Sequence, residues 1–382
     1  MSGDPLLAWR DHFPILASTT YMISHSLGAM PATVPGAVAE YARQWGERGI
    51  RAWEEGWWTM PLTIGDKIAR IIGAPPGSVV MQPNVSIAQW MILSCFDWSQ
   101  RRNRLVSEEM NFPTNLYNFH ELTAAGARLH LVPSPDGIII PTEAMLDAID
   151  EETLLVCLSH VLFRSSYQQD LAAITRRAHE VGAMVVADIY QSAGTVPLNV
   201  TALRVDFATG GSVKWLCGGP GAGYLYVRPD LVPQLRPKLT GWAAHERPFA
   251  FAPGPVVHAP DMARFFHGTP AIPALFAAAP GYDLIHEVGV AQIREKSVRQ
   301  TQRLIALADE AGLVVRSPRE PEQRGGVVVL DVPDGAAVTA RVAEQNILVD
   351  YRPNAGIRIA PHFYTTDDEV DATIRALRQL TV

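Results

Sequence analysis

The middle of the chain alternates short apolar runs with amphipathic stretches, and this alternation limits the possible folds more than any other feature. The apolar runs at 154–163, 183–190 and 206–211 are predicted to be buried strands. Between the first two, residues 170–182 keep their apolar side chains on one helical face, and Gly182 supplies a stop signal. The pattern predicts βα units with right-handed crossovers on a mostly parallel sheet, hence an α/β fold.

The flanking sequence extends this interpretation on both sides. Upstream, we predict a helix at 59–73, a strand at 78–82 and a second helix within 83–96. Beyond Pro270 the βα alternation ends, and one long helical stretch is followed by a shorter segment with an α+β pattern. These later elements are a helix at 282–313, a strand at 325–332, a helix at 336–346 and a strand ending at 356–361. We therefore predict three parts: an N-terminal segment 1–30 packing on the small domain, a large domain 31–270 and a small C-terminal domain 271–382.

Composition excludes several classes of protein. The 382 residues carry 32 Lys and Arg against 39 Asp and Glu, so nucleic acid is not an expected partner. No apolar run is long enough for a membrane helix, and the first residues do not resemble a secretory or transit signal. Three cysteines without a CxxC pair suit a reducing compartment, so we expect a cytoplasmic protein. The histidines show no ligand spacing, and no metal site is predicted.

Two charged residues are candidates for chemistry. Asp188 lies at the carboxyl end of one predicted strand, and Lys214 follows another in the glycine-rich stretch 210–223. Ligands of open α/β sheets bind at these strand ends, so the two side chains are expected to meet there. Burial lowers the pKa of a lysine and prepares its amine to attack a carbonyl. On spacing alone, a buried structural ion pair is an equally good explanation.

At this point the chain resembles the fold-type I pyridoxal-phosphate enzymes of the class V aminotransferase group, and most closely the kynureninases. The resemblance runs in order along almost the whole chain. It is carried by SLGAMP (26–31), 53–80, NFPTNLY (111–117), ADIYQSAG (187–194), SVKWLCGGPGAGYLYV (212–227), GWAAHERPFAF (241–251), HGTPAIPAL (267–275) and IRIAPHFY (357–364). It implies a mostly parallel seven-stranded sheet flanked by helices, a smaller α+β C-terminal domain, pyridoxal 5'-phosphate as the cofactor, and a homodimer with shared active sites.

The resemblance also implies roles for individual residues. Lys214 would form the Schiff base with the cofactor, and Asp188 would pair with its ring nitrogen so that the ring accepts electrons as a quinonoid. Phe112 would stack on the ring, and Ser159 and Gln191 would contact it. The implied phosphate contacts are Asn84, Val85 and Ser86 at a helix N-terminus, Ser212, and, from the neighbouring subunit, Trp242 and Thr269.

For the substrate, the resemblance implies that Arg358 grips an α-carboxylate, which a planar guanidinium suits. An amino acid or an amino-acid conjugate is therefore expected. The chain departs from the kynureninases in four places: Val213 stands where they have a tyrosine, Gln191 where they have a histidine, Asn115 where they have an aspartate, and His25, which we expect beside the substrate, where they have an asparagine.

These departures lead to a ranked set of functions. The first is cleavage of a Cβ–S or Cβ–C bond in an amino acid or conjugate, such as a cysteine S-conjugate of secondary metabolism. Kynureninase-like enzymes of lincosamide antibiotic pathways are similar in acting on such conjugates. The alternatives are true kynureninase, which hydrolyses kynurenine to anthranilate and alanine, decarboxylation-coupled oxidative deamination or transamination, and a scaffold without catalysis.

Overall fold

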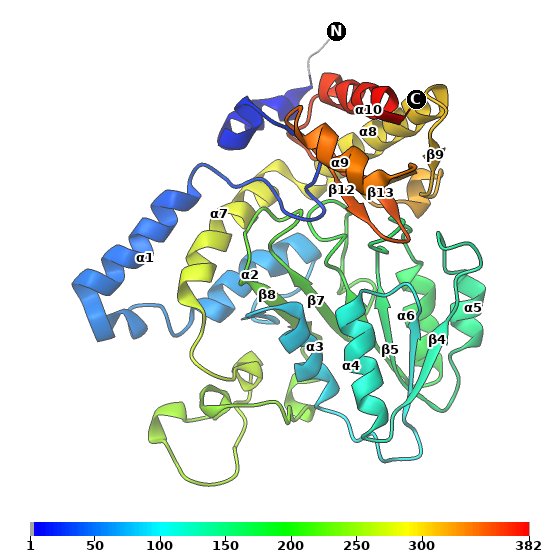
Figure 1. The fold of residues 1–382 in the computed structure, drawn as a ribbon. Helices are drawn as coiled ribbons and strands as arrows, with labels where there is room; N and C mark the ends of the chain where they lie inside the picture. Colours follow the sequence, from blue (N-terminus) through cyan, green and yellow to red (C-terminus); the bar gives the residue numbers. More distant parts are fainter. Residues whose placement is uncertain (1–3, 382) are drawn as a thin grey trace.

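A seven-stranded sheet organises the larger part of the molecule, in a computed structural model that describes residues 4–381. The strand order is β2-β8-β7-β6-β5-β3-β4, and β8 is antiparallel to both of its neighbours while the other pairings are parallel (Figure 1). The strands are β2 (Val79–Gln82), β3 (Arg104–Glu108), β4 (Arg128–Val132), β5 (Thr153–Ser159), β6 (Met184–Asp188), β7 (Phe207–Gly211) and β8 (Gly223–Val227). The predicted strands at 78–82, 154–163, 183–190 and 206–211 correspond to β2, β5, β6 and β7.

Helices cover both faces of this sheet because its strands are apolar on both sides. In β5, Leu155 and Cys157 join one apolar cluster, whereas Val156 and Leu158 join the other, as the two-residue period of a strand requires. Helices α3 (Val85–Leu93) and α4 (Pro113–Thr123) cover the first face. The second face is covered by α2 (Met60–Ile72), α5 (Thr142–Asp147), α6 (Leu171–Glu180) and α7 (Ile272–Val288).

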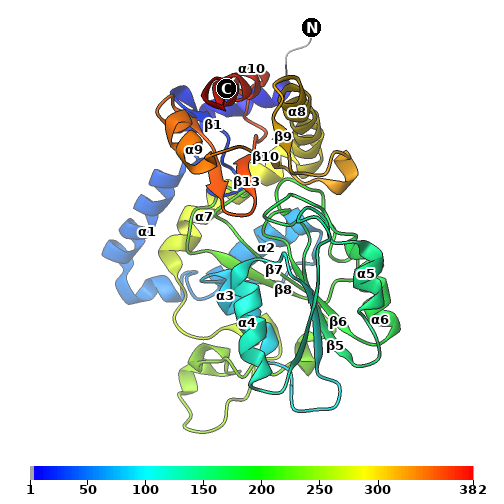
Figure 2. The ribbon, with the colours of Figure 1, turned by 45° about the vertical axis from the view of Figure 1, so that its right-hand side comes forward.

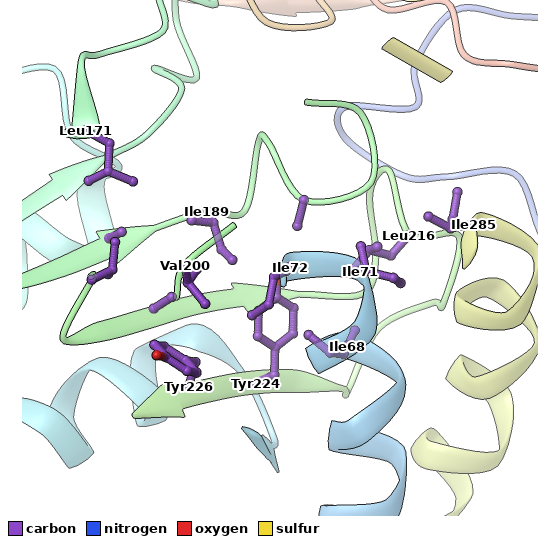
Figure 3. Close-up of a cluster of buried hydrophobic side chains, with 14 of the residues drawn as sticks. Ile68, Ile71, Ile72, Leu171, Ile189, Val200, Leu216, Tyr224, Tyr226 and Ile285 are labelled. Carbon is purple, nitrogen blue, oxygen red and sulfur yellow. The ribbon is translucent and has the colours of Figure 1, made fainter. Parts of the chain in front are cut away.

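On the second face, helix α2 packs on the sheet through a stripe of apolar side chains. Figure 3 shows Ile68, Ile71 and Ile72 of α2 gathered around Tyr224 of β8, all of them buried. Their spacing of three and four residues places them on one side of the helix. Gly73 then ends α2 with a left-handed backbone, so that α2 lies within the stretch 59–73 that was predicted to be a helix.

A smaller antiparallel sheet, ordered β12-β13-β10-β9, follows in the C-terminal part (Figure 2). Its strands are β9 (Val314–Val315), β10 (Val328–Asp331), β12 (Asp350–Arg352) and β13 (Gly356–Ile359), and its helices are α8 (Val290–Glu310), α9 (Gly335–Ala343) and α10 (Asp367–Thr381). The single long helix predicted at 282–313 is wrong. The chain forms α7 and α8 instead, and Gly289 between them has a positive φ of 85° that interrupts the helical hydrogen bonding.

The N-terminal segment contacts the C-terminal part. Strand β1 (Thr20–Tyr21) pairs in parallel with β11 (Ile347–Leu348), and Ile23 bridges to Ala360. The segment then reaches the large sheet, where Gly28 donates a backbone hydrogen bond to Val213. Helix α1 (Val34–Arg48) follows and projects from the body (Figure 1). The boundaries predicted near residues 30 and 270 stay predictions, and residues 1–3 and 382 of the outer parts lie outside the described residues.

Among residues 4–381, none of the helices combines the length and the apolar character that crossing a bilayer requires.

Candidate active site

The carboxyl ends of the central strands and the turn before α3 surround a cavity of about 220 Å³. This is the place where open α/β sheets bind ligands. Eight of the predicted residues line it: Asn84, Val85, Ser86, Phe112, Ser159, Asp188, Gln191 and Lys214.

Asp188 ends β6, and its carboxylate is held by two donors. Its Oδ1 accepts a hydrogen bond of 2.9 Å from the Tyr190 N–H, and its Oδ2 accepts one of 2.9 Å from Asn115 Nδ2. Burial raises the pKa of Asp188, while these two hydrogen bonds and the nearby Lys214 oppose the rise. The carboxylate is therefore fixed in orientation and keeps lone pairs free for a ring nitrogen.

Asn115 is itself held in one orientation by a buried polar network. Its Nδ2 also donates to Asn111 Oδ1 at 2.8 Å, and Ser159 Oγ donates to the same oxygen at 3.0 Å. Asn111 Oδ1 accepts hydrogen bonds from several donors. If the Asn115 amide were flipped, its own oxygen would face Asn111 Oδ1, and two acceptors would be in contact. The network thus keeps an N–H, and never an oxygen, against Asp188.

Lys214 lies just after β7, between two aromatic rings. Its Nζ is 4.2 Å from the ring centroid of Tyr190 and 5.7 Å from that of Phe112, both within cation–π range. Burial lowers the pKa of Lys214 to about 8, with Asp188 acting in the opposite direction. The neutral, nucleophilic form of this amine is therefore more populated near neutral pH than in an exposed lysine.

The turn PNVSIAQ forms an anion site at the N-terminus of α3. Asn84 caps the helix, and its Oδ1 accepts the N–H of Ile87 at 3.0 Å. The N–H groups of Val85 and Ser86, in the first helical turn, have no partner within the helix. Together with the Ser86 hydroxyl they form a set of donors on the cavity wall, at the end of the helix dipole that favours a phosphate.

Arg358 of β13 lies beyond the cavity wall and is engaged by Asp350 of β12. Its Nε donates to Asp350 Oδ1 at 2.8 Å and its Nη2 to Oδ2 at 2.6 Å, while Nη1 donates to the carbonyl of Phe163 at 2.9 Å. Phe163 lines the cavity, so this contact connects the arginine to it. Of the five N–H groups of a guanidinium, two are left for a further acceptor, one on each terminal nitrogen.

His25 completes the surroundings of Asp350. Its Nε2 lies 3.0 Å from Asp350 Oδ1, and its backbone carbonyl accepts a hydrogen bond of 3.2 Å from Gln191 Nε2. Burial lowers the pKa of His25 to about 4, so its ring is neutral at physiological pH. Burial alone would raise the pKa of Asp350, but the hydrogen bonds from His25 and Arg358 hold it well below its usual range.

Five predicted residues do not line the cavity in this chain: Arg358 and His25, described above, and Ser212, Trp242 and Thr269. The Ser212 hydroxyl is buried and bonded to the carbonyl of Ala222 and the hydroxyl of Tyr282. Trp242 lies in an exposed aromatic group, and Thr269 lines a separate small cavity of about 60 Å³. Phosphate contacts from Trp242 and Thr269 were expected to come from a neighbouring subunit, and they stay predictions.

Sequence reasoning missed two residues that the structure brings to the site. Tyr190 lines the cavity only two positions after Asp188, and the resemblance did not single it out. Asp350 is the register partner of Arg358 in the β12–β13 pair. The signal for Asp350 was available, because the turn between two short strands places residues 350 and 358 opposite each other.

Taken together, the donors fit one kind of cofactor. A weakly basic lysine amine suits an aldehyde, the fixed carboxylate suits a ring nitrogen, and the α3 N-terminus suits a phosphate. Phe112, with 43% of its surface exposed beside the cavity, offers a ring face for stacking. The fold and the site thus define a pyridoxal-phosphate enzyme of fold type I.

Comparisons with known proteins give the family. The model of the aminotransferase class-V family matches residues 34–376. The chain is 33% identical to a kynureninase of Pseudomonas fluorescens over 398 residues, covering 99% of this chain and 92% of the relative. It is 32% identical to a kynureninase of Burkholderia pseudomallei, with the same coverage. The chain therefore belongs to the class-V aminotransferase family, as a kynureninase-like enzyme that uses pyridoxal 5'-phosphate.

Solved structures agree on the fold. A cysteine desulfurase from Thermococcus onnurineus superposes with a TM-score of 0.87 at 21% identity, covering 98% of this chain and 97% of the other. A cystine C–S lyase, in complex with cysteine persulfide, superposes with a TM-score of 0.86 at 21% identity, covering 96% and 99%. At these sequence identities the similarity shows that the fold is shared and nothing more.

Proposed function

We propose that this enzyme cleaves a Cβ–S or Cβ–C bond in an α-amino acid or an amino-acid conjugate. One observation carries the proposal: Lys214, Asp188 and, through Phe163, Arg358 converge on one cavity. An amine, a carboxylate and a carboxylate-binding guanidinium are the groups needed to hold such a substrate against the cofactor. The cofactor, when bound, supplies an aldehyde carbon and a ring that withdraws electrons from Cα.

In this proposal the site residues have separate roles. The Lys214 amine would hold the aldehyde carbon of the cofactor, and it is also placed to take the Cα proton of the substrate. A pKa near 8 suits both tasks, because the amine can give and accept a proton near neutral pH. Asp188 keeps a proton on the ring nitrogen, and Asn115 keeps Asp188 aligned.

The substrate carboxylate is assigned to the two N–H groups that Arg358 has left. Asp350 already takes one side of the guanidinium, so the fork is oriented in advance. Arg352 lies 3.1 Å from Asp350 Oδ2, which gives the Arg352, Arg358 and Asp350 cluster one net positive charge. A single carboxylate neutralises that charge, which supports an α-amino acid as the substrate class.

We further infer a homodimer with shared sites. The supporting observation is the exposed aromatic arm, defined as Trp242, Phe249 and Phe251, whose last two side chains are 61% and 71% exposed. Large exposed aromatic groups are typical of protein interfaces. Trp242 and Thr269 would then reach the phosphate of the neighbouring subunit, as the resemblance implies. A cytoplasmic location and a role in secondary metabolism are inferred from the sequence resemblance and the three free cysteines.

The deciding experiment is a product analysis of the purified holoenzyme. Cysteine S-conjugates, kynurenine and simple amino acids are incubated separately, and thiol, pyruvate, ammonia, anthranilate and alanine are measured. Bond cleavage at Cβ of a conjugate releases the thiol, and the three-carbon remainder takes up water to give pyruvate and ammonia. The Lys214→Ala variant is expected to lose at least about 1,000-fold in rate. Cofactor-bound protein that leaves Cβ of every compound intact contradicts the proposal.

A second candidate is true kynureninase, which the two kynureninase relatives favour. Kynurenine and water would then give anthranilate and alanine. Val213 argues for the first candidate, because valine replaces the phenol that the resemblance places before the lysine. Oxygen uptake or carbon dioxide release without Cβ cleavage identifies decarboxylation instead.

A further inference from the structure

Tyr190 is an aromatic residue of the cavity that has no role in the reaction proposed above. It follows β6 directly and lines the same cavity as Asp188 and Lys214. Among the residues that line this cavity it is the one tyrosine, and Val213, beside Lys214, offers no hydroxyl.

The ring of Tyr190 limits where a planar ligand can lie. Lys214 Nζ is 4.2 Å from its centroid and 5.7 Å from that of Phe112, so the amine lies close to both aromatic rings. A planar ring whose substituent reaches Nζ is therefore brought close to these two aromatic rings and can stack on one of them. Stacking against such faces stabilises a heteroaromatic ring.

The hydroxyl of Tyr190 lies at the end of β7. A Cβ atom on Gly211 would come within 2.4 Å of this hydroxyl, so the glycine leaves the space that the phenol occupies. Gly211 is paired with Gly223 of β8, and a Cβ on Gly223 would come within 2.7 Å of the Asn84 backbone. The Tyr190 hydroxyl thus lies beside Gly211, and the register partner of Gly211, Gly223, lies beside the turn that begins α3.

The same hydroxyl is free to bind a ligand. No residue between 4 and 381 forms a hydrogen bond with it, although the ring is largely enclosed. Burial, and secondly Asp188, raise the pKa of Tyr190 to about 12. The phenol therefore keeps its proton at physiological pH and acts as a donor.

We propose that the Tyr190 hydroxyl donates a hydrogen bond to the cofactor phosphate, completing the donor set of Asn84, Val85 and Ser86, while its ring lies against the cofactor ring. This inference rests on the proposed placement of the phosphate at the N-terminus of α3. It adds a phosphate ligand from the turn directly after β6, the strand whose last residue, Asp188, would serve the opposite end of the cofactor.

The test compares binding of pyridoxamine 5'-phosphate and pyridoxamine to the apoprotein. Neither compound has an aldehyde, so covalent attachment to Lys214 does not contribute, and they differ only in the phosphate. Tyr190→Phe removes the hydroxyl and keeps the ring. It is expected to weaken the phosphorylated ligand roughly tenfold or more, as for one hydrogen bond to a charged group, and to leave pyridoxamine unchanged. Tyr190→Ala is expected to weaken both ligands.

Ser86→Ala serves as the matched variant, because it removes another hydroxyl of the proposed phosphate site and should show the same selective loss as Tyr190→Phe. Equal affinity of Tyr190→Phe and the parent for the phosphorylated ligand overturns the inference. So does an equal loss for both ligands, which would place the hydroxyl against the ring. A parent protein that binds the two ligands equally well instead contradicts the phosphate site itself. Circular dichroism of the apoproteins verifies folding, and the unbonded hydroxyl makes Tyr190→Phe a mild substitution.

Discussion

At the scale of single residues, the most unusual group outside the cavity is the carboxyl of Glu108. It ends β3, is fully buried, and accepts the N–H of Ser159 through Oε1 at 2.9 Å. Its Oε2 has no hydrogen-bond partner among residues 4–381. Burial raises the pKa of Glu108 to about 8, since the Ser159 N–H only partly offsets the desolvation. Glu108 is therefore protonated in the folded protein at neutral pH.

This shift predicts a pH-dependent stability. The folded protein keeps the Glu108 proton up to about pH 8, whereas the unfolded chain releases it near the ordinary carboxyl value, so the stability falls as the pH rises between the two. The loss from this residue is at most about 1.4 kcal/mol per pH unit. Glu108→Gln, which mimics the protonated form, should flatten the profile. Denaturant unfolding of the apoprotein between pH 5 and 9, as approximate limits set by these two pKa values, measures it.

Glu109→Gln is the control, because Glu109 is the next residue and is exposed. It should keep the pH profile of the parent. Parallel profiles for Glu108→Gln and the parent would show that Glu108 is ionised in the folded protein.

Much of the site could be predicted from single residues, and the residues that were missed were missed for physical reasons. Asp188 and Lys214 were found because strand ends of a parallel sheet converge, and the resemblance supplied six more cavity residues but not Tyr190. The pairing of Arg358 with Asp350 was missed because it depends on the cross-strand register of two short strands, of three and four residues. The donor role of Asn115 was missed because it depends on Asn111, a residue without a distinctive pattern.

At the scale of elements, close packing between α2 and β2 depends on one glycine. A Cβ on Gly65 of α2 would come within 2.2 Å of the Val79 carbonyl oxygen in β2. Both partners are backbone, so neither can move aside without shifting a whole element. The apolar pattern predicted the helix at 59–73 but not its distance from the sheet, because the pattern reports which face is buried and not how closely it packs.

We expect Gly65→Ala to destabilise the protein by about 3 kcal/mol, the upper part of the range for overpacked sites. Gly36→Ala in α1 is the matched control, since nothing lies within 4 Å of its added Cβ. That substitution should stabilise α1 by about 0.5–1 kcal/mol through helix propensity. Thermal unfolding of the two variants measures both effects. A Gly65→Ala variant as stable as the parent would contradict the packing of α2 against β2.

The break between α7 and α8 shows a second limit at this scale. Apolar periodicity continues through residues 282–313, so it favoured one helix. Gly289 was the only local signal, and an isolated glycine within a helical pattern is common. The direction of the chain after Gly289 is decided by tertiary packing, with Ile293 and Leu304 buried in different apolar clusters.

At the scale of the whole molecule, the exposed aromatic arm predicts the oligomeric state. Light scattering should give the parent a mass of twice 41.8 kDa. Phe251→Ser in the arm should shift the mass toward the monomer and weaken cofactor binding. Val314→Ser is the control, because Val314 is also an exposed apolar residue, at 59%, but lies in β9 of the C-terminal sheet. A monomeric parent, or a dimeric Phe251→Ser variant with unchanged cofactor affinity, would contradict the shared site.

The pairing of β1 with β11 has a consequence for biosynthesis. Thr20 and Tyr21 leave the ribosome well before their partners Ile347 and Leu348, which follow more than 300 positions later in the chain. The same holds for His25, whose partner Asp350 follows more than 300 positions later. Such distant contacts form late, because a long loop must close first. The large sheet can therefore assemble during translation before the carboxylate-binding corner of the active site, which needs Asp350 and Arg358 and is completed only after both have been made.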